Sequence, residues 1–260
     1  MISNKHNFLY EFKFAVMDLG YDLEHHGSTE FCRQLDILSN KIFLTLADFY
    51  SLSKQTSDVI TNDYEKKMSF FSELGNKIKS NQKNNDEETN EIISSNYLTQ
   101  QNMAYEFLFF QETVLNFGIA IKIYSFFEDI LELLCGLYEK YCNIKIDNEN
   151  AKSKLSKHVE YLETNFKVKL TKTNEWYLLT SWNKVRNRFM HGYGILNRHE
   201  SDLKKRIEMI GLDIVEKPYI YNVEQYICIK PINIKELIML IDVILSKCIV
   251  DIEVLKKLGI

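Results

Sequence analysis

The sequence predicts an all-α protein, a helical bundle that carries a small β-hairpin insertion and an N-terminal helical extension. Apolar side chains recur at spacings of three and four over most of the 260 residues, as they do on helix faces. Only nine glycines and two prolines occur, far fewer than the turns of sandwiches, barrels or Rossmann sheets use. One segment, 212–230, is instead rich in β-branched and aromatic side chains and predicts the hairpin.

The N-terminal part of the chain predicts three helices and then a linker. The segment 80–91, SNQKNNDEETNE, has no apolar side chain over twelve positions, which is typical of a polar linker. Residues 1–79 are therefore expected to form an N-terminal helical subdomain or an extension of the bundle, and residues 92–260 the main helical domain. The three N-terminal helices are expected over 5–26, from a cap at Ser28 to Phe49, and over 56–79.

The main domain predicts four more helices around the hairpin. Gly192 and Gly194 are expected to end one of them, because glycine adopts the left-handed conformation that closes helices. His158 falls in a lysine-rich helix and is expected at the surface. The helices are expected over 96–141, 150–166, 174–191 and 233–257.

Several classes of protein are excluded by what the sequence lacks. No glycine-rich phosphate loop of the G-x-G-x-x-G or G-x-x-x-x-G-K kind occurs, and the five cysteines show no C-x-x-C spacing. No cofactor and no metal site are therefore expected. The N-terminus lacks a signal-peptide core, and no apolar run approaches the roughly 18 residues that cross a bilayer. We expect a cytoplasmic protein that has no membrane partner.

The net charge of −4 conceals a strongly basic segment. Residues 152–206 hold thirteen Lys and Arg against five Asp and Glu, a net charge of +8, so the rest of the chain carries −12. Four of the five arginines lie in this segment, and the planar guanidinium suits phosphate. The alternative is a solvated basic face on which arginine falls by chance. The residues expected to bind RNA are Lys184, Arg188, Arg198, Lys204 and Lys205.

The string WNKVRNRFMHGYG, residues 182–194, contains the candidate catalytic residues Arg186, Asn187 and His191. Asn187 and His191 are four residues apart and share a helix face, and Arg186 adjoins Asn187. The helix macrodipole favours a protonated imidazole in the last turn. No metal ligands accompany these residues. The pattern indicates metal-independent attack of an RNA 2′-hydroxyl on its own phosphate, in which His191 moves protons and Arg186 stabilises the phosphorane.

The same string resembles the signature of the HEPN superfamily, an Arg followed four to six residues later by His, commonly with Asn directly after the Arg. The continuation His191-Gly192-Tyr193 is similar to the R-x4-H-x-Y variant of HEPN toxins. The stretch 124–128, YSFFE, resembles the aromatic-plus-Glu part of an early HEPN helix. The resemblance spans about residues 95–257.

This resemblance implies a HEPN-like bundle that acts as a homodimer, with Glu128 as a partner of Arg186 and Tyr193 as the residue that an antitoxin modifies. It implies a metal-independent endoribonuclease, the toxin or effector of a prokaryotic antiviral defence, abortive-infection or toxin–antitoxin system, with an antitoxin or sensor protein as partner. The alternative is a non-catalytic HEPN module that binds nucleotides or serves as an adaptor in a defence complex. A third interpretation is a structural bundle in which Arg186 only pairs with Glu128.

Overall fold

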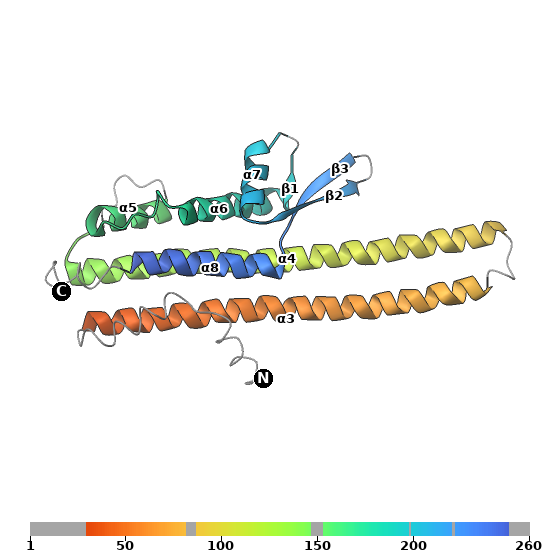
Figure 1. Cartoon of the computed structure of the whole chain (residues 1–260), viewed down its shortest axis with the longest axis horizontal. Helices are drawn as coiled ribbons and strands as arrows, with labels where there is room; N and C mark the ends of the chain where they lie inside the picture. Colours follow the sequence, from red (N-terminus) through yellow and green to blue (C-terminus); the bar gives the residue numbers. More distant parts are fainter. Residues whose placement is uncertain (1–29, 82–86, 147–152, 198, 220–221, 250–260) are drawn as a thin grey trace.

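Two long antiparallel helices form the frame of the protein (Figure 1). They are α3 (Glu30–Asn81) and α4 (Glu87–Cys142), of 52 and 56 residues, and each is about 80 Å long at 1.5 Å per residue. The expected helix over 5–26 and the cap at Ser28 lie outside the residues that the structure describes. The computed structural model describes residues 30–81, 87–146, 153–197, 199–219 and 222–249.

Most of the polar segment 80–91 is helical. α3 continues through Asn81 and α4 begins at Glu87, and residues 82–86 lie outside the described part of the chain. The helical residues of this segment include glutamates such as Glu91, which a solvated helix accommodates at little cost. The lack of apolar side chains here therefore indicates helix ends that are exposed to solvent, and it does not indicate a linker of twelve residues.

The break expected between Phe49 and Thr56 is wrong, because α3 runs through it without interruption. No glycine or proline stands there to stop the helix. Ser53, a polar residue within this stretch, is buried, and its hydroxyl donates to Oδ1 of Asn116 on α4 at 3.1 Å. The Asn116 amide in turn donates to the Ile229 carbonyl at 3.1 Å. We call this chain of two hydrogen bonds the polar tie.

Helix α8 (Pro231–Cys248) packs against both long helices. Its proline lies in the first turn, where the missing N–H group costs no helical hydrogen bond. The apolar face predicted for this helix is confirmed. It consists of the buried residues Ile234, Leu237, Ile238, Ile241, Ile244 and Leu245.

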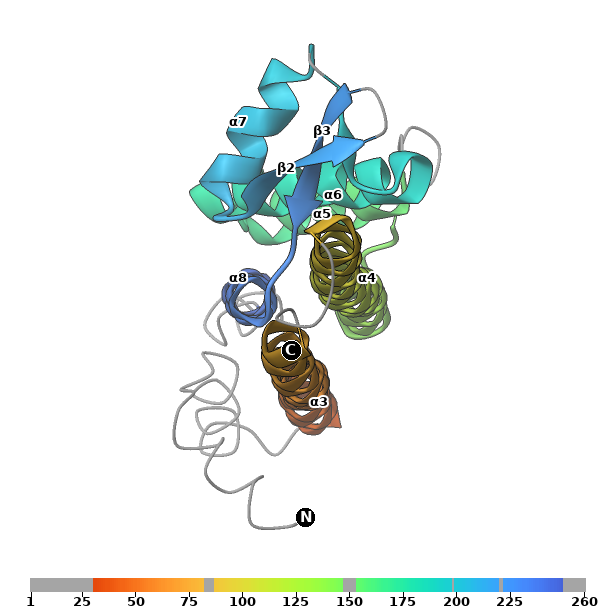
Figure 2. The ribbon, with the colours of Figure 1, turned by 90° about the vertical axis from the view of Figure 1, so that its right-hand side faces the viewer.

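A further layer, α5 (Lys154–Phe166) and α6 (Asn174–Gly192), covers α4 on the side away from α3 (Figure 2). The N-caps Ser153 and Thr173 each accept a hydrogen bond from a backbone N–H of the first turn. Figure 2 shows the resulting order of layers: α3, then α4 beside α8, then the layer of α5 and α6. The expectation that His158 on α5 is at the surface is wrong, because that residue is 4% exposed.

The predicted hairpin is present and belongs to a three-stranded sheet of order β1-β3-β2. Strands β2 (Asp213–Tyr219) and β3 (Asn222–Cys228) pair antiparallel, and β1 (Ile195–Leu196) pairs antiparallel with β3. The sequence did not predict β1 or the short helix α7 (Ser201–Met209). Two and nine residues are too few to show a clear period.

One core joins all the helical layers. It includes Leu46 of α3, Phe127 of α4, Leu162 of α5, Val185 of α6 and Ile238 of α8. The first half of α3 therefore shares the core of the main domain. The described part of the chain contains no helix that is apolar enough over sufficient length to cross a membrane.

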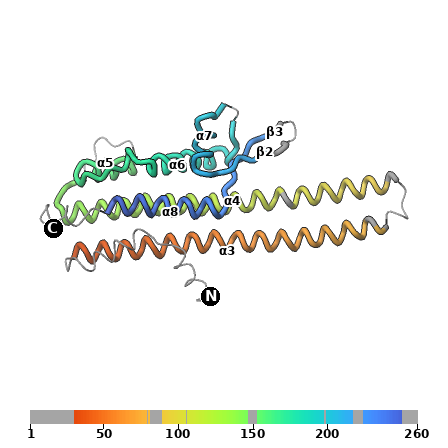
Figure 3. The backbone as a smooth tube through the Cα atoms, in the orientation of Figure 1, coloured from red at the N-terminus to blue at the C-terminus, as the bar shows by residue number. Residues whose placement is uncertain are grey.

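The outer halves of the two long helices project from this core as an arm (Figure 3). We define the arm as residues 54–81 of α3 and 87–107 of α4. No side chain that the structure describes in these two stretches is buried. The aromatic rings of Phe71 and Tyr97 meet edge to face between the helices, with centroids 6.1 Å apart. This ring contact is part of the packing between α3 and α4 that holds the arm.

Candidate functional site

The end of α6 positions the candidate residues. Trp182, Val185 and Phe189 are buried on one side of the helix, as their spacing predicts. The Phe189 ring stacks on Phe117 of α4 at a centroid distance of 4.1 Å. Helix α6 closes at Tyr193, which adopts the left-handed conformation with φ 52° and donates its backbone N–H to the Phe189 carbonyl.

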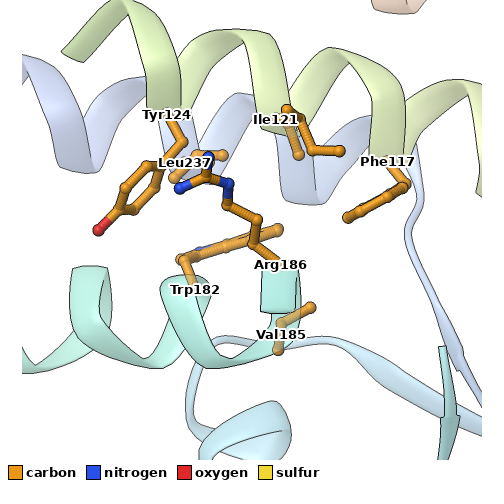
Figure 4. A pocket seen from close by; sticks show the side chains of 8 residues that line it. Phe117, Ile121, Tyr124, Trp182, Val185, Arg186 and Leu237 are labelled. Carbon is orange, nitrogen blue, oxygen red and sulfur yellow. The ribbon is translucent and has the colours of Figure 1, made fainter. Parts of the chain in front are cut away.

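Arg186 points toward α4, where it lies near Tyr124 (Figure 4). Two groups of α4 lie close to its guanidinium. Its Nη1 lies 4.0 Å from Oε2 of Glu128, the partner that the resemblance suggests, and each of these two side chains is 31% exposed. Its guanidinium carbon lies 5.3 Å from the centroid of the Tyr124 ring, within the range of a cation–π contact. Burial and the nearby Glu128 raise the pKa of Tyr124 well above its usual value, so that the phenol stays protonated.

The space beside Arg186 is small. The pocket lined by Ile121, Tyr124, Trp182 and Arg186 has a volume of about 10 Å³, enough for roughly one water molecule. A substrate would have to meet Arg186 from the surface. The exposed part of the Arg186 side chain, 31%, is therefore the part available for an anion.

Asn187 and His191 are exposed on the solvent side of α6. In the described part of the chain, no hydrogen bond or ion pair occupies either side chain. At 100° per residue, His191 lies about 140° around the helix from Arg186. The structure therefore brings Arg186 together with Glu128 and leaves Asn187 and His191 open to solvent. Tyr193 is 82% exposed directly after them.

The basic residues near the site divide into engaged and exposed groups. Arg188 is only 19% exposed; it donates to the Ile195 carbonyl and pairs with Glu200 at 3.1 Å, so it fastens the turn after α6. Lys184 pairs with Asp202 of α7 at 2.7 Å. Lys204 is half-buried and Lys205 is exposed. Arg198 lies outside the described residues.

One residue outside the predicted site, Arg206, completes the surroundings. Arg206 of α7 pairs with Asp202 at 3.1 Å, donates to the Ser181 hydroxyl at 3.3 Å and lies 4.7 Å from the Tyr177 ring centroid. The Lys184 and Arg206 side chains hold the pKa of Asp202 below its usual value. This network fixes α7 against α6. Asp202 and Arg206 are four residues apart on α7, whereas Lys184 and Ser181 come from α6.

Comparison with protein-family models, with curated proteins and with solved structures finds no match for this chain.

Proposed function

We propose that the protein is a metal-independent endoribonuclease. The observation that carries the proposal is the state of the motif at the end of α6. Arg186 lies beside Glu128 and Tyr124 with 31% of its side chain exposed, and Asn187 and His191 are exposed to solvent. Exposed Asn and His side chains that serve no packing or capping role in the described structure are available to a substrate.

The chemistry needs one proton carrier and one fixed cation. A neutral His191 imidazole takes the proton from an RNA 2′-hydroxyl, whose oxygen forms a bond to the adjacent phosphorus. Arg186 stabilises the charge of the phosphorane. The bond from phosphorus to the 5′-oxygen then breaks, and the imidazolium returns its proton to that oxygen. The products are a 2′,3′-cyclic phosphate and a 5′-hydroxyl.

The proposal is tested by incubating the purified chain with RNA in EDTA and sequencing the product ends. We expect cleavage by the natural sequence and a loss of about 10²–10⁴-fold in His191→Ala, the range that general acid–base catalysis contributes. His199→Ala, which removes an exposed histidine outside the motif, is the matched control and retains full activity. Undiminished cleavage by His191→Ala would refute the proposal.

We propose further that two copies meet at the end of α6. Met190 and Tyr193 are 60% and 82% exposed there, and large exposed apolar groups commonly mark interfaces. Light scattering should give twice the chain mass for the natural sequence and a single chain mass for Met190→Glu. A monomeric natural protein at micromolar concentration would contradict the dimer and leave the chemistry open to separate test.

The biological role that we propose is that of a toxin or effector in a prokaryotic defence or toxin–antitoxin system, regulated by a partner protein. It rests on the resemblance of residues 186–193 to the HEPN signature. Expression in bacteria should arrest growth, and His191→Ala should relieve the arrest at the same protein level.

A non-catalytic nucleotide-binding or adaptor role is the second candidate. The proximity of Glu128 to Arg186 favours this role, because a guanidinium that is paired with a carboxylate stabilises the negative charge of a phosphorane less. In that case RNA or nucleotide binds and no cleavage appears, and His191→Ala lowers affinity alone. The two functions are therefore separated by the same experiment with a binding readout added.

A further inference from the structure

A cavity of about 340 Å³ lies where the arm meets the sheet, away from the motif on α6. Its walls come from α3, α4, β2, β3 and the first residue before α8. The volume lies within the range of small-molecule sites, which begins near 300 Å³. It is much larger than the pocket of about 10 Å³ beside Arg186.

Most of this cavity wall is apolar. Ile60, Leu108 and Val215 contribute aliphatic side chains, and Tyr64 and Phe109 contribute aromatic rings. Such a surface binds the hydrophobic body of a ligand, while a few polar groups orient it. The identity of the ligand then depends on which polar groups in the wall are still available.

Two polar groups in the wall are already engaged. The Lys230 ammonium pairs with Asp213 at 2.5 Å, and the carboxylates of Asp213 and, more weakly, Glu112 raise the pKa of Lys230. The Cys228 sulfur accepts a hydrogen bond from the buried Thr113 hydroxyl at 3.8 Å, and burial raises the pKa of the thiol. Neither group is therefore the natural anchor for a ligand.

Glu112 has acceptor capacity left. Its Oε1 accepts a hydrogen bond from the Ser57 hydroxyl at 3.2 Å, and no described residue donates to its Oε2. An ionised carboxylate only accepts hydrogen bonds, so its complement is an N–H-bearing cation. This end of the cavity also carries one excess negative charge, because the two carboxylates of Glu112 and Asp213 face a single ammonium, that of Lys230.

We propose that this cavity binds a small organic cation, an ammonium group carried on an apolar and preferably aromatic body. The ammonium donates to Glu112 Oε2, and the body lies against Ile60, Leu108 and Val215. The rings of Tyr64 and Phe109 add favourable surface for a cation. The site is independent of the nuclease chemistry, because none of its wall residues belongs to the motif.

The test uses 2-phenylethylamine as the probe and the full-length protein with labelled Ile, Leu and Val methyl groups. Titration followed by NMR should shift the methyl signals of Ile60, Leu108 and Val215 saturably, and 2-phenylethanol, the neutral analogue, should bind at least tenfold more weakly. Glu112→Gln keeps an oxygen for Ser57 and removes the charge, so it should raise the dissociation constant for the amine at least tenfold. Glu106→Gln, an exposed position on the same helix outside the cavity, is the matched control and should change nothing.

Three results would overturn the proposal. They are no saturable shift at millimolar amine, equal binding of the alcohol, or equal affinity of Glu112→Gln. If Glu112→Gln does not fold, Ile60→Phe serves instead, because it fills part of the cavity from α3 and leaves the carboxylate in place. Amine binding that survives Ile60→Phe unchanged would locate the probe elsewhere and refute the site.

Discussion

At the scale of single residues, the ring beneath Arg186 is as informative as the carboxylate beside it. Cation–π contacts contribute about 0.5–2 kcal/mol, depending on how far they are desolvated. The ring of Tyr124 lies 5.3 Å from the guanidinium carbon and its hydroxyl is not needed for that contact. We expect Tyr124→Phe to retain cleavage activity and Tyr124→Leu to lose between about twofold and thirtyfold, as measured by kcat. Equal losses in both variants would assign the effect to the hydroxyl.

Glu128 has a neighbour that serves as its control. Asp129 follows directly in α4 and is exposed. Glu128→Gln removes the charge that orients Arg186, and we expect cleavage to fall about tenfold, the equivalent of 1.4 kcal/mol. Asp129→Asn should leave the rate unchanged. A loss of the same size in both variants would indicate a general electrostatic effect and would refute a positioning role for Glu128.

His158 makes stability depend on pH. Burial lowers its pKa in the folded protein, with the carboxylate of Glu132 opposing and Lys157 and Lys154 assisting. Below the unfolded value of about 6.5 the unfolded chain takes up the proton first, so stability falls as the pH falls from there. The urea midpoint should drop less between pH 7.5 and 5.5 in His158→Gln than in the natural sequence. His199→Gln, at an exposed position, should behave as the natural sequence does; identical curves for all three would exclude this coupling.

The site was only partly predictable for reasons visible in its residues. Arg186, Asn187 and His191 stand in one short string, so their spacing indicates their shared helix end. Tyr124 is 62 positions away from Arg186, and only packing of α6 on α4 brings its ring beneath the guanidinium. Arg188 and Lys205 are both basic residues in the sequence. In the structure, Arg188 has two internal partners, whereas Lys205 is exposed.

At the scale of elements, the turn after α6 depends on a glycine. Gly194 has φ +77°, and an added Cβ would lie 2.6 Å from the Phe189 ring. Gly194→Ala should therefore destabilise the protein by about 2 kcal/mol or more. Gly136→Ala is the matched control: that helical position is exposed and an added Cβ meets nothing within 4 Å, so we expect a gain of about 1 kcal/mol. Urea unfolding measures the free energy of unfolding of both variants. An unchanged stability of Gly194→Ala would show that the turn can rearrange.

Elements with a strong local pattern were predictable and those defined by distant contacts were not. The face of α8 and the β2–β3 hairpin follow from periodicity and composition. The continuity of α3 does not follow from local pattern. Ser53 looks like a loop residue in the sequence, and only the structure shows that its hydroxyl donates a hydrogen bond to Asn116. Strand β1 exists through its pairing with Tyr226 and Gln225 of β3, which no local signal announces.

At the scale of the whole molecule, the charge segregation has a structural counterpart. α4 carries nine acidic residues and two lysines, and α5 and α6, which together carry five basic and three acidic residues, pack on it. Lys154 pairs with Glu132 at 2.5 Å, and Arg186 pairs with Glu128 at 4.0 Å. Part of the acidic excess is therefore the internal counterpart of the basic segment. The sum of charges, −4, does not show this arrangement, because the opposite charges of neighbouring helices cancel in it.

The arm and the body should differ in local stability. No described side chain of the arm is buried, whereas α8 is buried along a full face. Opening of a region with few buried contacts costs less free energy than opening of the core. Hydrogen exchange followed by mass spectrometry should show faster exchange in residues 54–81 and 87–107 than in α8. Uniform protection along α3 and α4 would contradict this.

The polar tie at Asn116 also has a mechanical consequence. It joins α4 to α3 and to Ile229, two residues before α8, near the place where the arm leaves the core. About 44 Å of helix separate Asn116 from the start of α4 at Glu87, and about 12 Å separate it from Tyr124. If α4 rotated as a rigid helix about Asn116, the displacement of the Tyr124 ring would be about one quarter of the displacement at Glu87. Under that condition, a displacement of several ångströms at the tip would move the Tyr124 ring by about one ångström.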